Sequence, residues 1–99
     1  MTQLTILPDA RDDLRAIEHF SIQEFGASVA DDYMNRIERA LDRLMDYPES
    51  GPVYPGIRPQ VRYLSVGSHH LFYDFDGQTI TVARPASGHG ARRLAVGWT

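Results

Sequence analysis

The sequence predicts a single α+β domain: an N-terminal strand, an antiparallel two-helix hairpin, and then a three-stranded antiparallel meander. Two patterns of apolar residues predict this order. Their period is near 3.6 between residues 8 and 47 and near two after residue 60, with a proline- and glycine-rich stretch between the two parts. A chain of 99 residues has room for one domain. We therefore expect residues 1–99 to form one domain with an irregular tail at residues 85–99.

The strand and the first helix are predicted from local signals. Residues 4–7 form a short run typical of a strand, and Pro8 closes it. Proline is tolerated in the first turn of a helix, where Asp9 and Asp13 also suit the positive end of the helix dipole. The apolar stripe that follows stops at Gly26, which we expect to end the helix.

A second helix is expected at residues 28–47. Ser28 is a suitable N-cap, Asp31 follows it three residues later, and Pro48 ends the pattern. The tight joint between the two helical segments predicts an antiparallel helical hairpin.

The second half of the chain has the pattern of a β-meander. Prolines and glycines make residues 48–60 a loop. The runs at residues 61–66, 69–75 and 79–84 are rich in β-branched and aromatic residues and predict three strands. Asp76-Gly77, between the last two runs, is the strongest hairpin signal in the chain.

Composition and charge restrict the classes of function. The chain has no cysteine, so disulfides and thiolate metal sites are excluded. The net charge is −3, and all ten basic residues are arginines. Residues 1–50 hold five arginines and eleven acids, a balance of −6, whereas residues 51–99 hold five arginines and two acids, a balance of +3. The basic half indicates a surface for an acidic partner, although lopsided charge is also common in small domains.

The sequence gives no sign of export or membrane insertion. No basic residue precedes the short apolar run at the start, and no apolar run approaches the ~20 residues that cross a bilayer. We therefore expect a cytoplasmic protein that does not associate with membranes.

Four stretches together resemble the ParE branch of the ParE/RelE toxin family. Two belong to the helices: the opening Pro8-Asp9-Ala10 that leads to Leu14 and Ile17, and Phe25-Gly26 at the joint. The third is the end of the second helix, residues 37–44, with Tyr47-Pro48 and Gly51 after it. The fourth is an arginine-led strand, a glycine turn and an aromatic strand, residues 61–73. The resemblance covers about residues 4–84.

The resemblance implies a fold, partners and a function. It implies a four-stranded, antiparallel-type sheet with the helical hairpin on one face. It also implies the toxin component of a type II toxin–antitoxin system, neutralised by a cognate ParD-like antitoxin in a hetero-oligomer. We expect growth inhibition through direct binding to DNA gyrase, a role in plasmid stabilisation, no cofactor, and no direct nucleic-acid binding by the chain alone.

Two alternatives stay open. RelE-like relatives are ribosome-dependent mRNA endonucleases that use lysines, arginines and a tyrosine or histidine, but this chain has no lysine. His70 stands where they place an arginine, and a nuclease would use His70, Arg62, Arg84 and His89. The tail departs from the family pattern, since Arg84 runs into Pro85 and a histidine comes later, which leaves a degenerate, non-toxic member as the third reading.

Under the preferred reading no residue is catalytic, and a binding surface carries the function. We expect the surface that contacts the target or the antitoxin to include Arg62, His70, Phe72, Arg84, His89, Arg92 and Arg93.

Alternation along the predicted strands assigns side chains to faces. His69 and His70 are adjacent and point to opposite faces, so they do not form a metal site, and we expect no bound metal. We expect one histidine in the core and the other on the open face. Tyr63 and Tyr73 are expected in the core and Phe72 exposed on the other face. Asp74 and Asp76 are not expected to form a catalytic pair, because Asp76 belongs to the turn.

Overall fold

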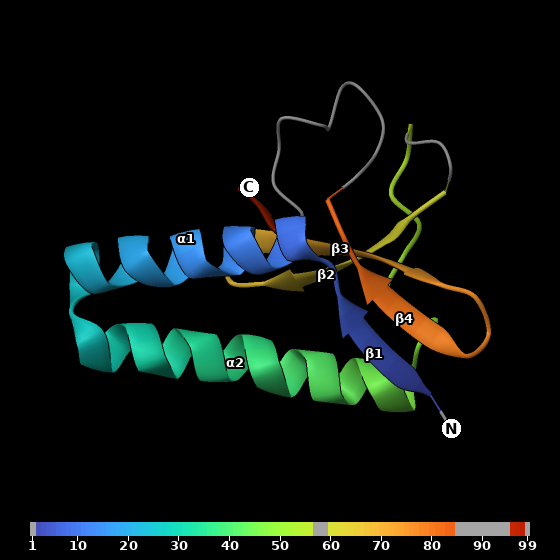
Figure 1. The fold of residues 1–99 in the computed structure, drawn as a ribbon, viewed down its shortest axis with the longest axis horizontal. Coiled ribbons are helices and arrows are strands. Elements are labelled where there is room, and N and C mark those ends of the chain that lie inside the picture. Colours follow the sequence, from blue (N-terminus) through green and yellow to red (C-terminus); the bar gives the residue numbers. More distant parts are fainter. Residues whose placement is uncertain (1, 57–59, 85–95, 99) are drawn as a thin grey trace.

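A computed structural model of the protein describes residues 2–56, 60–84 and 96–98 (Figure 1). Its elements follow the predicted order and give an α+β fold, with one further short strand at the end. They are β1 (Gln3–Ile6), α1 (Pro8–Phe25), α2 (Ala27–Asp46), β2 (Arg62–Val66), β3 (His69–Phe75), β4 (Thr79–Val82) and β5 (Val96–Trp98).

A single residue joins the two helices, which run side by side in Figure 1. Gly26 has a φ of 90°, a conformation that residues with a Cβ rarely adopt. Its N–H donates to the carbonyl of Ile22, and its own carbonyl accepts from the N–H of Ala30. The predicted N-cap at Ser28 is therefore wrong: α2 begins at Ala27, Gly26 is the N-cap residue, and no side chain caps the helix.

The sheet is mixed, and the expectation of an antiparallel-type sheet is wrong in this respect. The strand order is β1-β4-β3-β2, with β1 parallel to β4 and the other neighbours antiparallel. The chain leaves β1 through the helical hairpin before it returns to the sheet, a crossover that allows parallel pairing. Figure 1 shows β1 alongside β4, so strands from the two ends of the sequence meet.

The tail was expected to be irregular over residues 85–99, which is wrong at residues 96–98. These form β5, which pairs antiparallel with residues 69–71 of β3. The remaining tail residues, 85–95 and 99, lie outside the described residues.

The core lies between the helical hairpin and one face of the sheet. Ile17 and Leu44 come from the helices, and Leu71, Tyr73 and Ile80 come from β3 and β4. Tyr63 is not part of this core, against expectation: it lies opposite Phe72 in the β2–β3 register, on the face away from the helices. The described part of the chain contains no membrane-spanning helix, because neither helix combines the necessary length and apolarity.

The predicted turn at Asp76-Gly77 is confirmed. The Asp76 carboxylate accepts hydrogen bonds from the N–H groups of Gln78 (2.9 Å) and Thr79 (2.8 Å), and these bonds lower its pKa. Asp76 is thus a turn residue, as expected.

Candidate functional site

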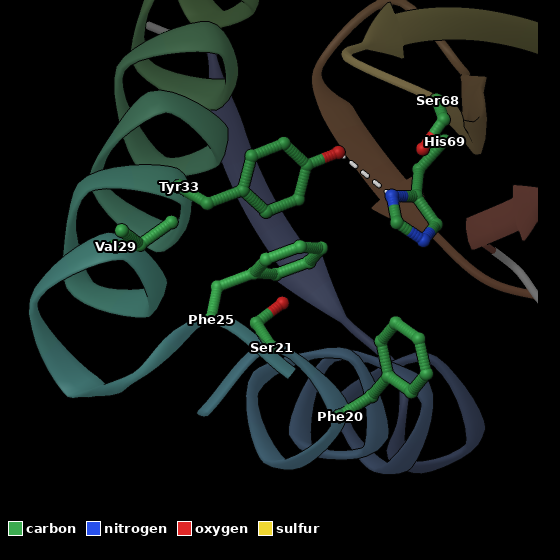
Figure 2. A pocket seen from close by; sticks show the side chains of 7 residues that line it. All are labelled: Phe20, Ser21, Phe25, Val29, Tyr33, Ser68 and His69. Atoms are coloured by element: carbon green, nitrogen blue, oxygen red, sulfur yellow. Dashed lines mark hydrogen bonds between the residues drawn. The ribbon is translucent and has the colours of Figure 1, made fainter. Parts of the chain in front are cut away.

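Tyr33 of α2 and His69 of β3 connect the helical hairpin to the sheet (Figure 2). The Tyr33 hydroxyl donates to the carbonyl oxygen of Val66 at 2.6 Å and lies 2.7 Å from Nδ1 of His69. Since a tyrosine has one hydroxyl proton, Nδ1 of His69 carries a proton and donates to Tyr33. Burial lowers the pKa of His69 and raises that of Tyr33, so both are neutral at pH 7.

This connection depends on a glycine in the β2–β3 turn. Gly67 has a φ of 57°, and a Cβ there would lie 2.8 Å from the Tyr33 ring and its hydroxyl. The ring of Tyr33 therefore packs directly on the turn backbone, which fixes the position of His69 two residues later.

An apolar hollow lies beside these residues at the tip of the helical hairpin. Its volume is about 240 Å³, and Figure 2 shows Tyr33 and His69 on one side of it and the phenylalanines of α1 on the other. Phe25 and Val29 line it and are 63% and 50% exposed. Such exposed apolar groups around a concavity are typical of a protein-binding surface. The remaining lining residues are Phe20, Ser21 and Ser68.

The opposite face of the sheet carries a cluster of aromatic rings. Tyr54 packs edge-on against Tyr63 and Phe72, with ring centroids 5.4 and 5.0 Å apart. His70 packs edge-on against Tyr63 at 5.0 Å, and its Nδ1 lies 2.9 Å from the Ser65 hydroxyl. One histidine in the core and the other on the open face is the predicted arrangement. The expected exposure of Phe72 is wrong: it is only 4% exposed, because the loop residue Tyr54 packs on it.

Arg62, the first residue of β2, is hydrogen-bonded to the loop that follows α2. Its guanidinium donates to the carbonyl oxygens of Glu49 (3.2 Å) and Gly51 (2.8 Å). The Tyr73 hydroxyl donates to the carbonyl of Pro48 and accepts from the N–H of Gly51, and burial raises the pKa of Tyr73. Arg62 and Tyr73 thus hold the loop that follows α2.

Arg84 forms an ion pair with Asp13 of α1. It donates two hydrogen bonds to the Asp13 carboxylate, at 2.7 and 3.3 Å, which raise the pKa of Arg84. Asp13 is only 3% exposed, so the pair replaces the solvation that this carboxylate lost. Asp13 lies on the same helix stripe as the buried Ala10 and Ile17, so helical periodicity indicates that this carboxylate is buried, although it does not indicate its partner.

The four predicted binding residues that the structure describes do not form one surface. His70 and Phe72 share the open face of the sheet, while Arg62 and Arg84 are bonded elsewhere. His89, Arg92 and Arg93 lie outside the described residues. Within the described residues, no group of three or more histidine and carboxylate side chains is arranged to hold a metal ion.

Comparisons with known proteins agree on one family. The family model described as ParE toxin of type II toxin-antitoxin system, parDE, matches residues 4–90. Toxin ParE1 of Mycobacterium tuberculosis (strain H37Rv) is 37% identical over 78 residues, which cover 78% of this chain and 80% of the relative. Toxin ParE3 of Caulobacter vibrioides is 32% identical over 63 residues, 64% of this chain and 63% of the relative.

A solved structure supports the fold. The structure described as the chromosomal ParDE TA system from P. aeruginosa aligns with a TM-score of 0.71 over 83% of this chain and 90% of the matched chain, at 23% sequence identity. With the family model matching most of the sequence, the chain belongs to the ParE toxin family of type II toxin–antitoxin systems.

Proposed function

We propose that this chain inhibits DNA gyrase through direct protein contact, acts in the cytoplasm, and is neutralised there by a cognate ParD-like antitoxin. Membership in the ParE family supports the toxin role and the type of partner. The inhibition involves no catalytic residue of the chain.

The observation that carries this proposal is the separation of the candidate nuclease residues. Cleavage of RNA needs a proton acceptor close to cations that stabilise the phosphate in the transition state. His70 lies on the open face of the sheet, whereas Arg62 is bonded to loop carbonyls and Arg84 to Asp13. Neither Arg62 nor Arg84 is therefore placed to act with His70, and the chain has no lysine to replace them.

The apolar hollow at the hairpin tip supports the antitoxin part of the proposal. An amphipathic helix of the antitoxin would place apolar side chains against Phe25 and Val29 and remove them from water. Phe25→Ser is expected to weaken binding of the antitoxin at least roughly tenfold, by analogy with buried aromatic residues at other interfaces. Tyr47→Ser is the matched control, because Tyr47 is an equally exposed aromatic residue (65%) at the other end of α2. Calorimetry measures the affinity for the antitoxin. Equal losses of affinity in the two variants would show that the hollow is not part of the interface.

The function itself is tested by pulse labelling just after the chain is induced without an antitoxin. Gyrase inhibition predicts a prompt loss of thymidine incorporation while methionine incorporation initially continues. A supercoiling assay with purified gyrase and purified chain then checks for direct inhibition.

The other outcomes identify the alternatives. Immediate loss of methionine incorporation, together with cleaved mRNA, would replace the proposal with an endonuclease. Unchanged incorporation of both labels, with folded chain present in the cells, would indicate a non-toxic family member.

A further inference from the structure

Three arginines of α2 line a groove beside the β2–β3 turn. Arg36, Arg39 and Arg43 form one wall with Ala40, and residues 65–67 form the other, around a volume of about 270 Å³. The ion pairs in the described part of the chain join Arg15 to Asp12 and Arg84 to Asp13, so none of these three arginines is neutralised by one. Arg36 lies over the Tyr33 ring, with its guanidinium carbon 5.5 Å from the ring centroid.

The arginine spacing is unfavourable for the helix alone. Arg39 and Arg43 are four residues apart on one helix face, where like charges repel. The chain offers a direct comparison on α1, where Arg11 and Arg15 have the same spacing but Arg15 is paired with Asp12 at 2.9 Å. An anionic partner would remove the repulsion in the α2 groove.

The groove also borders an open part of the sheet edge. The outer edge of β2 is covered at its start by backbone hydrogen bonds. The N–H of Tyr54 donates to the carbonyl of Val61, and the N–H of Tyr63 donates to the carbonyl of Pro52. Outward backbone groups recur every second residue along a strand, so those of Ser65 come next. No described strand covers β2 at this exposed residue.

We propose that this arginine groove binds an extended acidic segment of the antitoxin, with carboxylates at alternate positions; this rests on the proposed function. Arg39 and Arg43 are separated by about 6 Å along the helix axis, and Arg36 and Arg43 by about 10 Å. Alternate side chains of an extended strand are about 7 Å apart, so two carboxylates of one strand reach two of these arginines. Each guanidinium binds a carboxylate through two parallel hydrogen bonds, while the strand backbone meets Ser65.

The surrounding charges favour a short acidic peptide over a nucleic acid. Asp32 and Asp46 lie on the same side of α2, at the two ends of the arginine row, and residues 1–50 have a balance of −6. A continuous phosphate backbone would run beyond the arginines and over these carboxylates. A peptide with two or three acids fits the length of the basic row.

The test uses a fluorescein-labelled synthetic peptide with glutamate and valine at alternating positions, and the whole protein. Fluorescence anisotropy is expected to show binding that weakens with salt and is absent for the same peptide with glutamine in place of glutamate. Arg39→Glu/Arg43→Glu is expected to lower the affinity at least about tenfold, with Arg39→Gln/Arg43→Gln intermediate. The backbone amide of Ser65 is expected to shift in NMR spectra when the peptide binds.

The control is Arg11→Glu/Arg15→Glu, which makes the same change of charge at the same spacing on α1. It is expected to change the affinity by less than about threefold. Equal losses in both double variants would show that only the net charge matters and would overturn the proposal. The absence of peptide binding to folded wild-type protein would overturn it as well, as would tighter binding of a single-stranded oligonucleotide at the same arginines.

This result is separable from that of the proposed function. Pulse labelling without antitoxin tests gyrase inhibition, and the peptide assay contains no gyrase. If the protein inhibits gyrase but does not bind the peptide, only the assignment of the groove is wrong. If it binds the peptide but does not inhibit gyrase, only the proposed target is wrong.

Discussion

At the scale of single residues, the hydroxyl of Tyr33 is shared by the helical hairpin and the sheet. It bonds to the carbonyl of Val66 and to Nδ1 of His69 in a partly buried position. Tyr33→Phe leaves both partners without this hydroxyl, and we expect the free energy of unfolding to fall by about 1–3 kcal/mol in urea titrations. Tyr47→Phe is the control, because the exposed Tyr47 hydroxyl makes no hydrogen bond within the described residues. A loss below about 0.5 kcal/mol for Tyr33→Phe would contradict a role of this bond in stability.

His69 makes the stability of the fold depend on pH. Burial, and then the electrostatic effect of the neighbouring His70, lower the pKa of His69 below the ordinary 6.5. The unfolded chain therefore binds the proton more readily than the folded chain does. The stabilisation is complete above pH ~6.5 and is lost as the pH falls towards the folded-state pKa, by at most about 1.4 kcal/mol per pH unit.

Denaturation at a series of pH values tests this dependence. In His69→Gln the decline between pH 7 and 5 is expected to be shallower than in the wild-type protein. His19→Gln, at an exposed position of α1, is expected to keep the wild-type slope. An unchanged slope in His69→Gln would show that another group is responsible.

The roles of single residues were only partly predictable from sequence. Alternation alone placed one of the two adjacent histidines in the core and the other on the open face, and the structure assigns the core position to His69. Alternation misplaced Tyr63, because the register between β2 and β3, and not the apolar character of the residue, decides which face the ring takes. The pairing of Arg84 with Asp13 joins positions 71 residues apart, and nothing in the local sequence indicates which arginine meets the buried acid.

At the scale of elements, the hairpin joint depends on one backbone conformation. Gly26 ends α1 and precedes α2 with a φ of 90° and a ψ of 163°, a region open essentially to glycine alone. Gly26→Ala is expected to lower the free energy of unfolding by about 1–3 kcal/mol, although a Cβ at this position meets no atom within 4 Å. Thermal unfolding measures the loss.

Ser28→Ala is the informative control, because Ser28 lies inside the first turn of α2 and its side chain makes no capping bond. Its expected effect is below about 0.5 kcal/mol. A loss of about 1 kcal/mol or more would restore Ser28 as the N-cap.

The boundaries of helices and turns were predicted correctly where the local sequence determines them. Pro8, Gly26 and Asp76-Gly77 stand at the predicted starts, stops and turns. The direction of β1 relative to β4 was not predictable, because a period of two indicates a strand but not its partner. The short β5 escaped prediction for a similar reason: its three residues are stabilised by pairing with β3 and not by a pattern of their own.

At the scale of the whole molecule, the described arginines do not follow the division of charge along the sequence. The split of −6 and +3 predicted a basic second half that meets an acidic partner. Arg62 and Arg84 of that half are hydrogen-bonded to other residues of the chain, whereas three arginines of the acidic half line one groove. Side-chain periodicity on α2 is therefore a better guide to local potential than the net charge of a long segment.

The register of β1 with β4 also sets the timing of folding during synthesis. Gln3 pairs with Thr79, so the first strand waits for a partner made 76 residues later. At about 5–20 residues per second, translation needs roughly 4–15 s to supply it. During that interval the helical hairpin has no complete sheet to cover its apolar face, and contacts of such long range also slow folding itself. A chain with this topology therefore cannot complete its sheet before residue 79 has been made, however early its helices form.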